Sequence, residues 1–258
     1  MYIKEGDILR KGARRNKKIS KFYLFILVVL IAVFVVSAYI IINWVYETNK
    51  SKNVNSEIVS NVIKMPINPD GNALSSQEIE IDFDKLLEIN EQVVGWIKIE
   101  DTDINYPIVK AVDNNFYLNH NILKEVSQNG WIFMDYRNNE DFLDKNTVIF
   151  GHNIKSGIMF SDLKKIYNGS LNGDIKICVY NKTGEVNKYF VYSCYMEEPE
   201  SLPINPYIDN KNYSSFVSQI KSKSIYEYRT KITDNNTITL STCDSTGQKR
   251  ILVHAIKQ

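Results

Sequence analysis

TITLST at residues 237–242 and ILVHAI at residues 251–256 are two short runs rich in β-branched residues, separated by a polar stretch. Such residues fit an extended, pleated backbone, so each run predicts a β-strand. Six further runs, rich in β-branched and aromatic residues, come earlier and are separated by Gly, Asn and Asp turns. Eight or so short strands with few helices predict a mainly β chain folded as a closed barrel. The predicted strands are Val93–Ile99, Asn105–Val109, Trp131–Met134, Thr147–Phe150, Ile175–Tyr180, Tyr189–Met196, Thr237–Thr242 and Ile251–Ile256.

Short helices are expected outside the predicted strands. Val54, Ile58 and Val62 recur every four residues between polar neighbours, which predicts an amphipathic helix. Two prolines and a glycine follow and end it. A second helix is expected over 82–91, before the first strand. A third is expected as an insertion over 211–225, before the penultimate strand.

One stretch near the N-terminus, from Phe22 to Trp44, contains no charged residue. About 20 apolar residues rising 1.5 Å each span a hydrocarbon core of roughly 30 Å. This predicts a transmembrane helix over 22–44 that contacts membrane lipid. A cleaved signal peptide is the alternative, and Val36-Ser37-Ala38 loosely resembles a cleavage site. The apolar region of such peptides is only about 7–15 residues long, which favours the uncleaved anchor.

The charges that flank this span predict its orientation. Eight basic residues and two acidic residues precede it, whereas the charges that follow nearly balance. Positive residues are retained in the cytoplasm, so we expect a single-pass protein of the cell membrane with its N-terminus inside and the rest outside the cell. The formal net charge of +1 favours no nucleic-acid partner. The expected parts are a basic cytoplasmic tail (1–21), the anchor (22–44), a stalk with a helix and linker (45–75) and the main domain (76–258).

The chain has three cysteines, so in an extracellular domain at least one is unpaired. Cys178 and Cys194 flank a predicted hairpin loop at 181–184, but not symmetrically. Cys178 would face about Lys188, which leaves Cys194 six residues farther along, roughly 20 Å away. That distance is beyond the reach of a disulfide, so both cysteines are expected to be small core residues.

Cys243 differs because it ends the strand predicted over 237–242, where a side chain can leave the core. Arg250 opens the next strand. A cation near a thiol lowers its pKa or stabilises negative charge that forms on a substrate. Cys243 is therefore a candidate nucleophile, although spacing alone favours an unreactive exposed cysteine.

His152 is the complementary candidate, because it also lies just past a predicted strand end. Gly151 before it lets the backbone turn sharply, and a histidine exchanges protons near neutral pH. A loop histidine held by local hydrogen bonds is the alternative. His254 alternates within the last strand, which favours a structural role, and His120 is expected on a surface helix. Metal sites need about three convergent ligands, and these scattered residues predict neither a metal nor another cofactor.

Several segments together resemble the sortase family. Thr239-Leu240-Ser241-Thr242-Cys243 followed by Arg250 resembles the sortase active-site signature, Thr-Leu-x-Thr-Cys with a downstream arginine. Val148-Ile149-Phe150-Gly151-His152-Asn153 is similar to the segment that carries the sortase histidine. The resemblance covers roughly 80–258 and points to class B. Its other matching segments are Gly95-Trp96-Ile97-Lys98-Ile99, Ile104-Asn105-Tyr106-Pro107-Ile108, Tyr117-Leu118-Asn119, Ile132-Phe133-Met134-Asp135 with Arg137-Asn138, and Met159-Phe160.

The resemblance implies a fold and an activity. The fold is an eight-stranded sortase barrel with N-terminal helices and a helical insertion. The activity is a cysteine transpeptidase that cuts a sorting signal of a secreted protein after threonine. It then joins the new carboxyl end to an amine of a cell-wall peptidoglycan precursor. Cys243 would form the thioester, Arg250 would hold the signal and the oxyanion, and His152 would exchange protons with the two amines.

Five further positions are expected to bind the signal. One matches a class B position that lines the active site, two flank the nucleophile, and two match the class B loop that covers the signal. The five positions are Asn114, Ser241, Asp244, Tyr207 and Ile208. For Tyr207 and Ile208, core packing is an equally good interpretation.

Three alternatives differ in activity. A hydrolase would release the acyl-enzyme to water with the same three residues. A pilin-polymerising sortase usually carries a lid with an Asp-Pro-aromatic motif and often a C-terminal span. Residues 65–80 contain only Asn68-Pro69-Asp70, and no second apolar span follows 22–44. A non-catalytic binding module would not need cysteine, histidine and arginine each at a strand edge.

Overall fold

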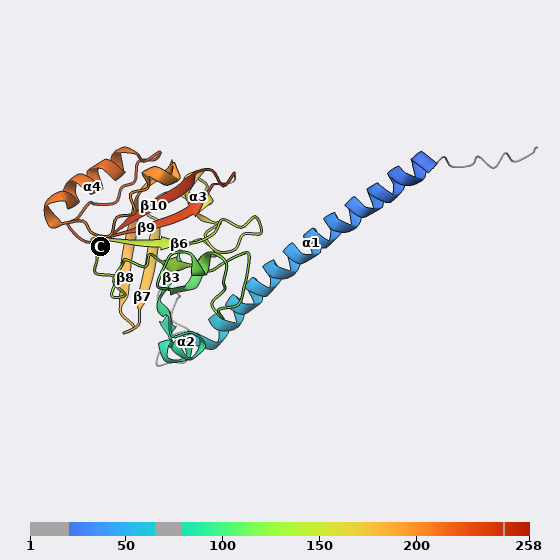
Figure 1. Cartoon of the computed structure of the whole chain (residues 1–258). Helices are drawn as coiled ribbons and strands as arrows, with labels where there is room; N and C mark the ends of the chain where they lie inside the picture. Colours follow the sequence, from blue (N-terminus) through green and yellow to red (C-terminus); the bar gives the residue numbers. More distant parts are fainter. Residues whose placement is uncertain (1–20, 65–78, 245) are drawn as a thin grey trace, which may run out of the picture. The chain divides into compact units, whose positions relative to one another are not determined.

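A computed structural model describes residues 21–64, 79–244 and 246–258 of the chain. Within these residues, eight strands close into a barrel in the order β10-β8-β7-β3-β4-β5-β6-β9 (Figure 1). Neighbouring strands are antiparallel except for the parallel pairs β4–β5 and β6–β9. The predicted closed eight-stranded barrel is confirmed. Its strands are β3 (Val93–Ile99), β4 (Asn105–Val109), β5 (Phe133–Met134), β6 (Asn146–Phe150), β7 (Lys176–Asn181), β8 (Val186–Glu197), β9 (Thr237–Cys243) and β10 (Arg250–Lys257).

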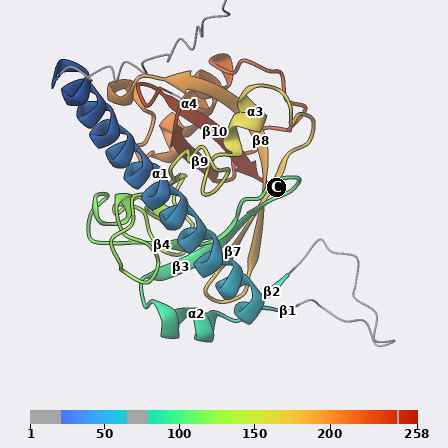
Figure 2. The same ribbon diagram turned by 90° about the vertical axis from the view of Figure 1, so that its right-hand side faces the viewer.

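The predicted strands agree in position with the observed ones, but β8 begins three residues earlier than expected, at Val186, and β5 begins two residues later. This strand is shorter than expected because Trp131 is bonded outside it. Its backbone N–H donates to the carbonyl of Tyr117 at 2.9 Å, and its ring Nε1 donates to the carbonyl of Pro107 at 3.1 Å. The β7–β8 hairpin has the expected register, with Cys178 opposite Lys188. Figure 2 shows β3 between β4 and β7, the two strands with which it pairs.

Strands β9 and β10 separate two hydrophobic clusters, because successive side chains point to opposite faces. Leu240 and Val253 belong to the main core, whereas Leu252 and Ile256 belong to a second cluster on the other face. Helix α4 (Asn210–Ser222) covers this second face with its buried apolar side chains. The predicted helical insertion before the penultimate strand is therefore confirmed. The buried side chains of α4 are Tyr213, Val217 and Ile220.

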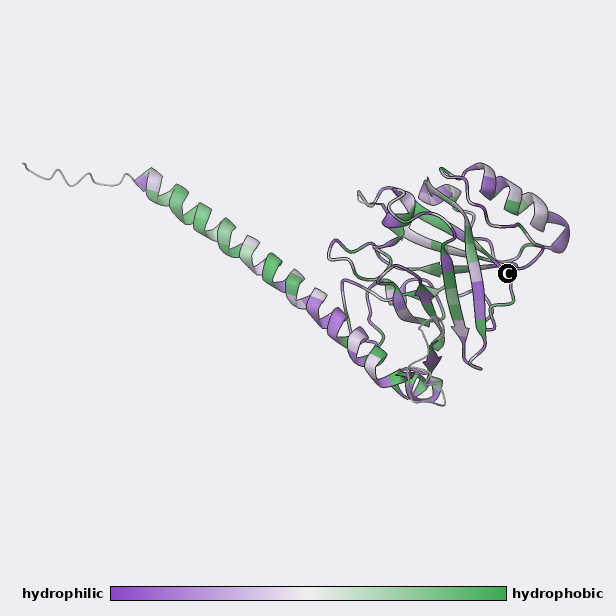
Figure 3. Cartoon of the chain, turned by 180° about the vertical axis from the view of Figure 1, so that it is seen from behind, coloured by the Kyte–Doolittle hydropathy of each residue, from purple (hydrophilic) through white to green (hydrophobic). Residues whose placement is uncertain are grey.

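Helix α1 runs unbroken from Lys21 to Val62. The sequence predicted a span over 22–44 and a separate short helix; they are joined because no proline or glycine interrupts residues 44–62. Among the described residues, α1 is the one helix long and apolar enough to cross a membrane. Figure 3 shows its first half as hydrophobic.

The chain divides into two compact units between Val45 and Tyr46. Within the second unit, Ile58 and Val62 of α1 are buried in the main core. The side chain of Asn129 also donates to Ser51 of the helix at 3.0 Å. The predicted boundaries at 21/22 and 75/76 border or lie in the parts of the chain outside the described residues, so the predicted domain division stays a prediction.

The remaining elements are short. Helix α2 begins after Asp82, which caps it by accepting the backbone N–H of Lys85 at 3.3 Å. This matches the helix expected over 82–91. The other elements are β1 (Ile63–Lys64), β2 (Glu80–Ile81), α2 (Phe83–Ile89), η1 (Phe116–Leu118), α3 (Leu163–Tyr167) and η2 (Pro199–Ser201).

Candidate active site

Cys243 and Arg250 are opposite each other in the β9–β10 ladder. Cys243 is the last residue of β9, Arg250 is the first residue of β10, and the two are direct partners in the antiparallel register. Directly opposed residues point to the same face, with Cβ atoms about 4.5–5.5 Å apart. Both side chains are half-buried, so they are accessible from solvent. The register thus brings the candidate nucleophile and the candidate cation together.

The parallel pairing of β6 with β9 brings His152 to the same end of the barrel. Phe150 pairs with Ser241, and the N–H of Gly151 donates to the carbonyl of Ser241 at 3.2 Å. His152 and Cys243 each lie two residues beyond this pair, and parallel strands lie about 4.7–4.9 Å apart. The side chain of Asn153 donates to the carbonyl of Cys243 at 2.8 Å and ties the two chain segments together.

The ring of His152 is held by a backbone carbonyl. Its Nε2 lies 2.8 Å from the carbonyl oxygen of Leu118. A carbonyl only accepts hydrogen bonds, so Nε2 carries the proton in this contact. In the neutral ring Nδ1 is then the basic nitrogen, the one able to take up a proton.

Gly130 makes this arrangement possible. Its φ is +55°, and a Cβ there would lie 2.8 Å from the carbonyl oxygen of Leu118 and 2.9 Å from Cδ2 of His152. Any other residue would therefore be strained and would push on the histidine and its acceptor. The sequence analysis did not single out Gly130. Glycine after asparagine marks a turn in sequence, but its contact with a histidine 22 positions along is a tertiary feature.

Asp244 organises the loop that joins β9 to β10. Its carboxylate accepts hydrogen bonds from the hydroxyl of Thr246 at 2.7 Å and from the backbone N–H of Lys249 at 3.1 Å. Hydrogen bonding from Thr246 keeps the pKa of Asp244 below its ordinary value. One guanidinium nitrogen of Arg250 donates to the carbonyls of Gly247 and Lys249. The other two make no hydrogen bond with the part of the chain that the structure describes.

The other predicted signal-binding residues lie in different surroundings. Asn114 uses both ends of its amide, donating to Asp135 at 3.0 Å and accepting the N–H of Tyr136 at 2.9 Å. Tyr207 is 68% exposed. Ile208 is half-buried against the cluster under α4.

Ser241 is another residue predicted to bind the signal. The sequence placed it beside the nucleophile, where it would contact the signal. Its side chain is only 2% exposed in this conformation.

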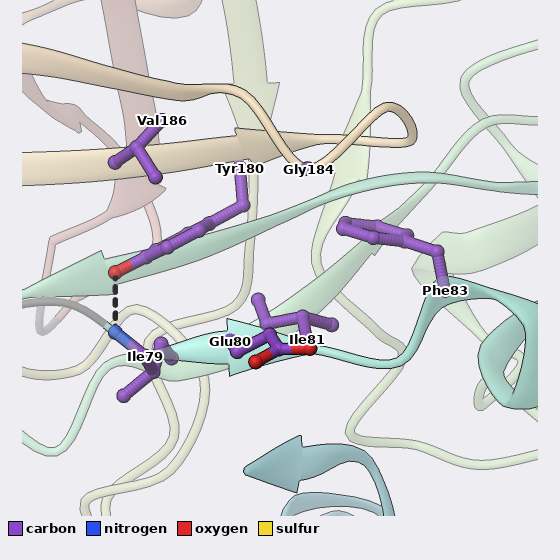
Figure 4. A pocket seen from close by; sticks show the side chains of 7 residues that line it. All are labelled: Ile79, Glu80, Ile81, Phe83, Tyr180, Gly184 and Val186. Carbon is purple, nitrogen blue, oxygen red and sulfur yellow. Dashed lines mark hydrogen bonds between the residues drawn. The ribbon is translucent and has the colours of Figure 1, made fainter. Parts of the chain in front are cut away.

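A pocket of about 240 Å³ lies elsewhere on the barrel domain, beside β2, α2 and the β7–β8 hairpin. Figure 4 shows Tyr180 above Ile79, joined by a 3.4 Å hydrogen bond from the backbone N–H of Ile79 to the tyrosine hydroxyl. None of its lining residues is a predicted site residue. The candidate site is therefore the solvent-accessible end of the ladder.

A family model described as the sortase domain matches residues 97–258, well over half of the chain. The chain belongs to the sortase family. Over 184 residues it is 35% identical to sortase B of Listeria monocytogenes, covering 65% of this chain and 69% of the relative. This sortase is also similar to two solved class B structures.

The first solved structure is sortase B of Bacillus anthracis, with a TM-score of 0.68 and 33% identity over 81% of this chain and 97% of that one. The second is a substrate complex of Staphylococcus aureus sortase B, with a TM-score of 0.61 and 31% identity over 68% and 84%. This chain is accordingly a class B sortase, and its activity is that of a cysteine transpeptidase.

Two cysteines of this sortase lie in the barrel core. Cys178 and Cys194 are free and buried, as the sequence predicted. Burial raises the pKa of both thiols, that of Cys194 to about 12. They are therefore protonated and poorly reactive at neutral pH.

Of the two remaining histidines, one was predicted correctly and the other was not. His254 is fully buried, and its Nδ1 lies 2.9 Å from the hydroxyl of Thr239, which confirms a structural position. His120 was expected on a surface helix, which is wrong. It follows the short helix η1 and forms an isolated bridge with Val126. Its ring stacks on Phe116 with centroids 4.1 Å apart, and this local contact holds it without a helix.

Proposed function

We propose that Cys243 of this sortase attacks the carbonyl carbon after threonine in a sorting signal. The sulfur–carbon bond of a thioester forms, and the peptide C–N bond breaks. The proton that the Cys243 sulfur loses passes through His152 to the leaving amine. His152 later takes a proton from the incoming amine, which attacks the thioester and releases the Cys243 sulfur. Splitting the transfer into two acyl steps is the reason for a covalent nucleophile.

The observation that carries this proposal is the register of two strand pairs. Cys243 faces Arg250 across the antiparallel β9–β10 pair. The parallel β6–β9 pair brings the residue after Gly151 to the same strand end. Arg250 has guanidinium nitrogens available to bind the oxygen on which negative charge develops in each acyl step. Asp244 orders the loop that precedes Arg250, so we propose a structural role for Asp244 in the active site.

The acceptor distinguishes this proposal from hydrolysis. We propose that it is an amine of a peptidoglycan precursor rather than water, as the resemblance to sortases implies. The test uses the full-length protein in detergent and quenched peptides from a library with threonine fixed before the scissile bond. Each peptide is incubated with and without an oligoglycine or a diamine.

Mass spectrometry of the products separates the two activities. We expect a ligated product when the amine is present, and no reaction with Cys243→Ala. Hydrolysed peptide alone at saturating amine would overturn the transpeptidation proposal and favour the hydrolase.

We further propose that residues 22–44 anchor the enzyme with its N-terminus in the cytoplasm and its catalytic domain outside the cell. The exposed apolar side chains in the first half of α1 support this, since lipid would remove them from water. The basic N-terminal stretch supports the orientation. A reporter that is active only outside the cytoplasm, fused after Gln258, should give signal. A reporter active only in the cytoplasm should not, and the reverse result would contradict the topology.

A further inference from the structure

The segment between β8 and α4 is fastened to the barrel by two side chains from another part of the fold. Asn146 donates through its amide nitrogen to the carbonyls of Pro203 and Asn205, both at 3.2 Å. Arg137 donates to the carbonyl between them, that of Ile204, at 2.7 Å. Three consecutive carbonyls are therefore held by two side chains.

We propose that Asn146 and Arg137 are positioning residues that set the place of this segment and thereby the binding of the sorting signal. The proposal rests on the proposed function and on the sequence-based expectation that Tyr207 and Ile208, at the end of the segment, bind the signal. Neither positioning residue needs to touch the signal, since each acts through the backbone of 203–205.

The surroundings of Asn146 fit this role. The residue is 0% exposed and begins β6. Its Oδ1 accepts the hydroxyl of Thr239 at 2.7 Å. An amide nitrogen has two hydrogens, and both are used by the carbonyls of the segment. Loss of these contacts would leave buried polar groups without partners, which is costly, so the barrel and the segment are held in one arrangement.

Arg137 is equally fixed. Its Nε and one terminal nitrogen donate to the two carboxylate oxygens of Asp135, both at 2.8 Å. Asp135 is 0% exposed. Burial would raise the pKa of Asp135, but hydrogen bonds from Arg137 and Asn114 outweigh it and hold the pKa below its ordinary value. A guanidinium locked by a bidentate carboxylate offers a rigid donor to Ile204.

The same cluster connects two residues that the sequence singled out. Asn114 donates to the carboxylate of Asp135, and the hydroxyl of Tyr207 donates to the carbonyl of Arg137 at 3.3 Å. Asn114 and Tyr207, two of the predicted signal-binding residues, are thus joined through the Arg137–Asp135 pair.

The N-terminal end of the segment lies beside Arg250. Glu197, the last residue of β8, pairs with Arg250 in the sheet. The next residue, Glu198, forms an ion pair with Lys249 at 3.0 Å. The segment therefore leaves from beside Arg250 and is fastened again at 203–205. Release of the second attachment would change the space beside Arg250 in which the signal must lie.

Asn138 provides a matched control for Asn146. It is 1% exposed, and its amide donates to Asp144 and to the carbonyl of Asn146 while accepting the N–H of Val148. All these contacts lie around β6, and none reaches 203–205. Asn138→Ala should therefore destabilise the fold much as Asn146→Ala does, without releasing the segment.

The test compares full-length wild type, Asn146→Ala and Asn138→Ala, with the best peptide from the threonine-fixed library. We expect Asn146→Ala to raise KM about tenfold and to change kcat by less than about threefold, the pattern of lost binding. Alkylation of Cys243 by iodoacetamide should keep its rate. Asn138→Ala should leave KM within about twofold of wild type. Arg137→Lys, which lacks the planar fork, should raise KM in the same direction.

Hydrogen exchange of the resting enzymes tests the fastening without turnover. Backbone amides over 200–208 should exchange faster in Asn146→Ala than in Asn138→Ala. Equal exchange in the two, or equal KM values, would overturn the proposal. If Asn146→Ala does not fold, Arg137→Lys decides in its place: unchanged KM and unchanged exchange over 200–208 would overturn it. Failure of the proposed function itself would appear differently, as wild type that forms no ligated product.

Discussion

The β9–β10 ladder has two pairs of residues on the same face with opposite surroundings. Cys243 and Arg250 form the pair at its end, and Thr239 and His254 form a pair four residues farther along. The first pair is half-buried, whereas the second is 0% exposed. The difference comes from what covers each pair, because the backbone geometry is the same.

The buried pair, Thr239 and His254, illustrates how burial changes the pKa of a histidine. Near His254 lie the ring of Tyr195, stacked with centroids 5.4 Å apart, and the cluster beneath α4. Desolvation by this burial lowers the pKa of His254 to about 3, so the ring is neutral at physiological pH. A histidine in that position contributes to packing, whereas His152 at the open end is the residue that we propose to exchange protons with the substrate.

The largest expected effect is at the open end of the ladder. Cys243→Ala should abolish cleavage and transpeptidation, because no other described thiol lies at the surface. Thermal unfolding should be unchanged, since half-exposed positions of this kind tolerate alanine to within about 0.5 kcal/mol. Turnover of the quenched peptide and a thermal melt measure the two effects.

Cys194→Ala is the matched control in the core. It should lower stability by about 1 kcal/mol and leave turnover intact. A methanethiosulfonate reagent should modify wild type at Cys243 first. More than a few per cent of wild-type turnover in Cys243→Ala would end the proposed mechanism.

Arg250 should show the second-largest effect. If it binds the oxyanion, Arg250→Ala should lose about 10²–10³ in rate, as removal of one oxyanion donor does. As a surface ion-pairing residue it would contribute only about 0–1 kcal/mol and barely alter the rate. Arg250→Lys keeps the charge but not the planar fork, so it should recover part of the activity. Near-normal turnover in Arg250→Ala with an unchanged melt would assign the oxyanion to another donor.

The smallest expected effect lies at the buried pair. The folded pKa of His254, about 3, is below its ordinary value of 6.5, so between these values the unfolded chain binds a proton that the folded chain does not. Stability is therefore full above about pH 6.5 and falls as the pH decreases. From about pH 7 to about pH 5.5 this one group should cost about 1 kcal/mol.

His254→Asn removes the titrating group and keeps a polar atom near the hydroxyl of Thr239. Denaturant unfolding at several pH values should show a flatter dependence in this variant. Parallel curves for wild type and variant would mean that His254 is protonated in the folded state as well. Turnover at pH 7 should be retained, in contrast to the two variants at the open end.

The strands could be predicted from the sequence alone, because each has local causes. β-Branched runs and Gly, Asn and Asp turns predicted every strand of the barrel, including the register that sets Cys178 opposite Lys188. The positions of Cys243, His152 and Arg250 at strand ends could also be predicted from the sequence, as could the apolar stretch in α1. Local patterns predicted the apolar span and the helix around 54–62 separately, but they could not show that the two form one helix, since propensity over the polar residues between them is a weak signal.

Which polar residues are exposed and which are buried depends instead on tertiary contacts. Ser241 reads in sequence like its neighbour Cys243, yet it is buried. Asn146 and Gly130 read as an ordinary strand residue and turn residue, yet one holds a segment about 60 positions away and the other makes room for His152. These properties depend on contacts between segments distant in the chain, which the periodicity of side chains along one strand does not encode.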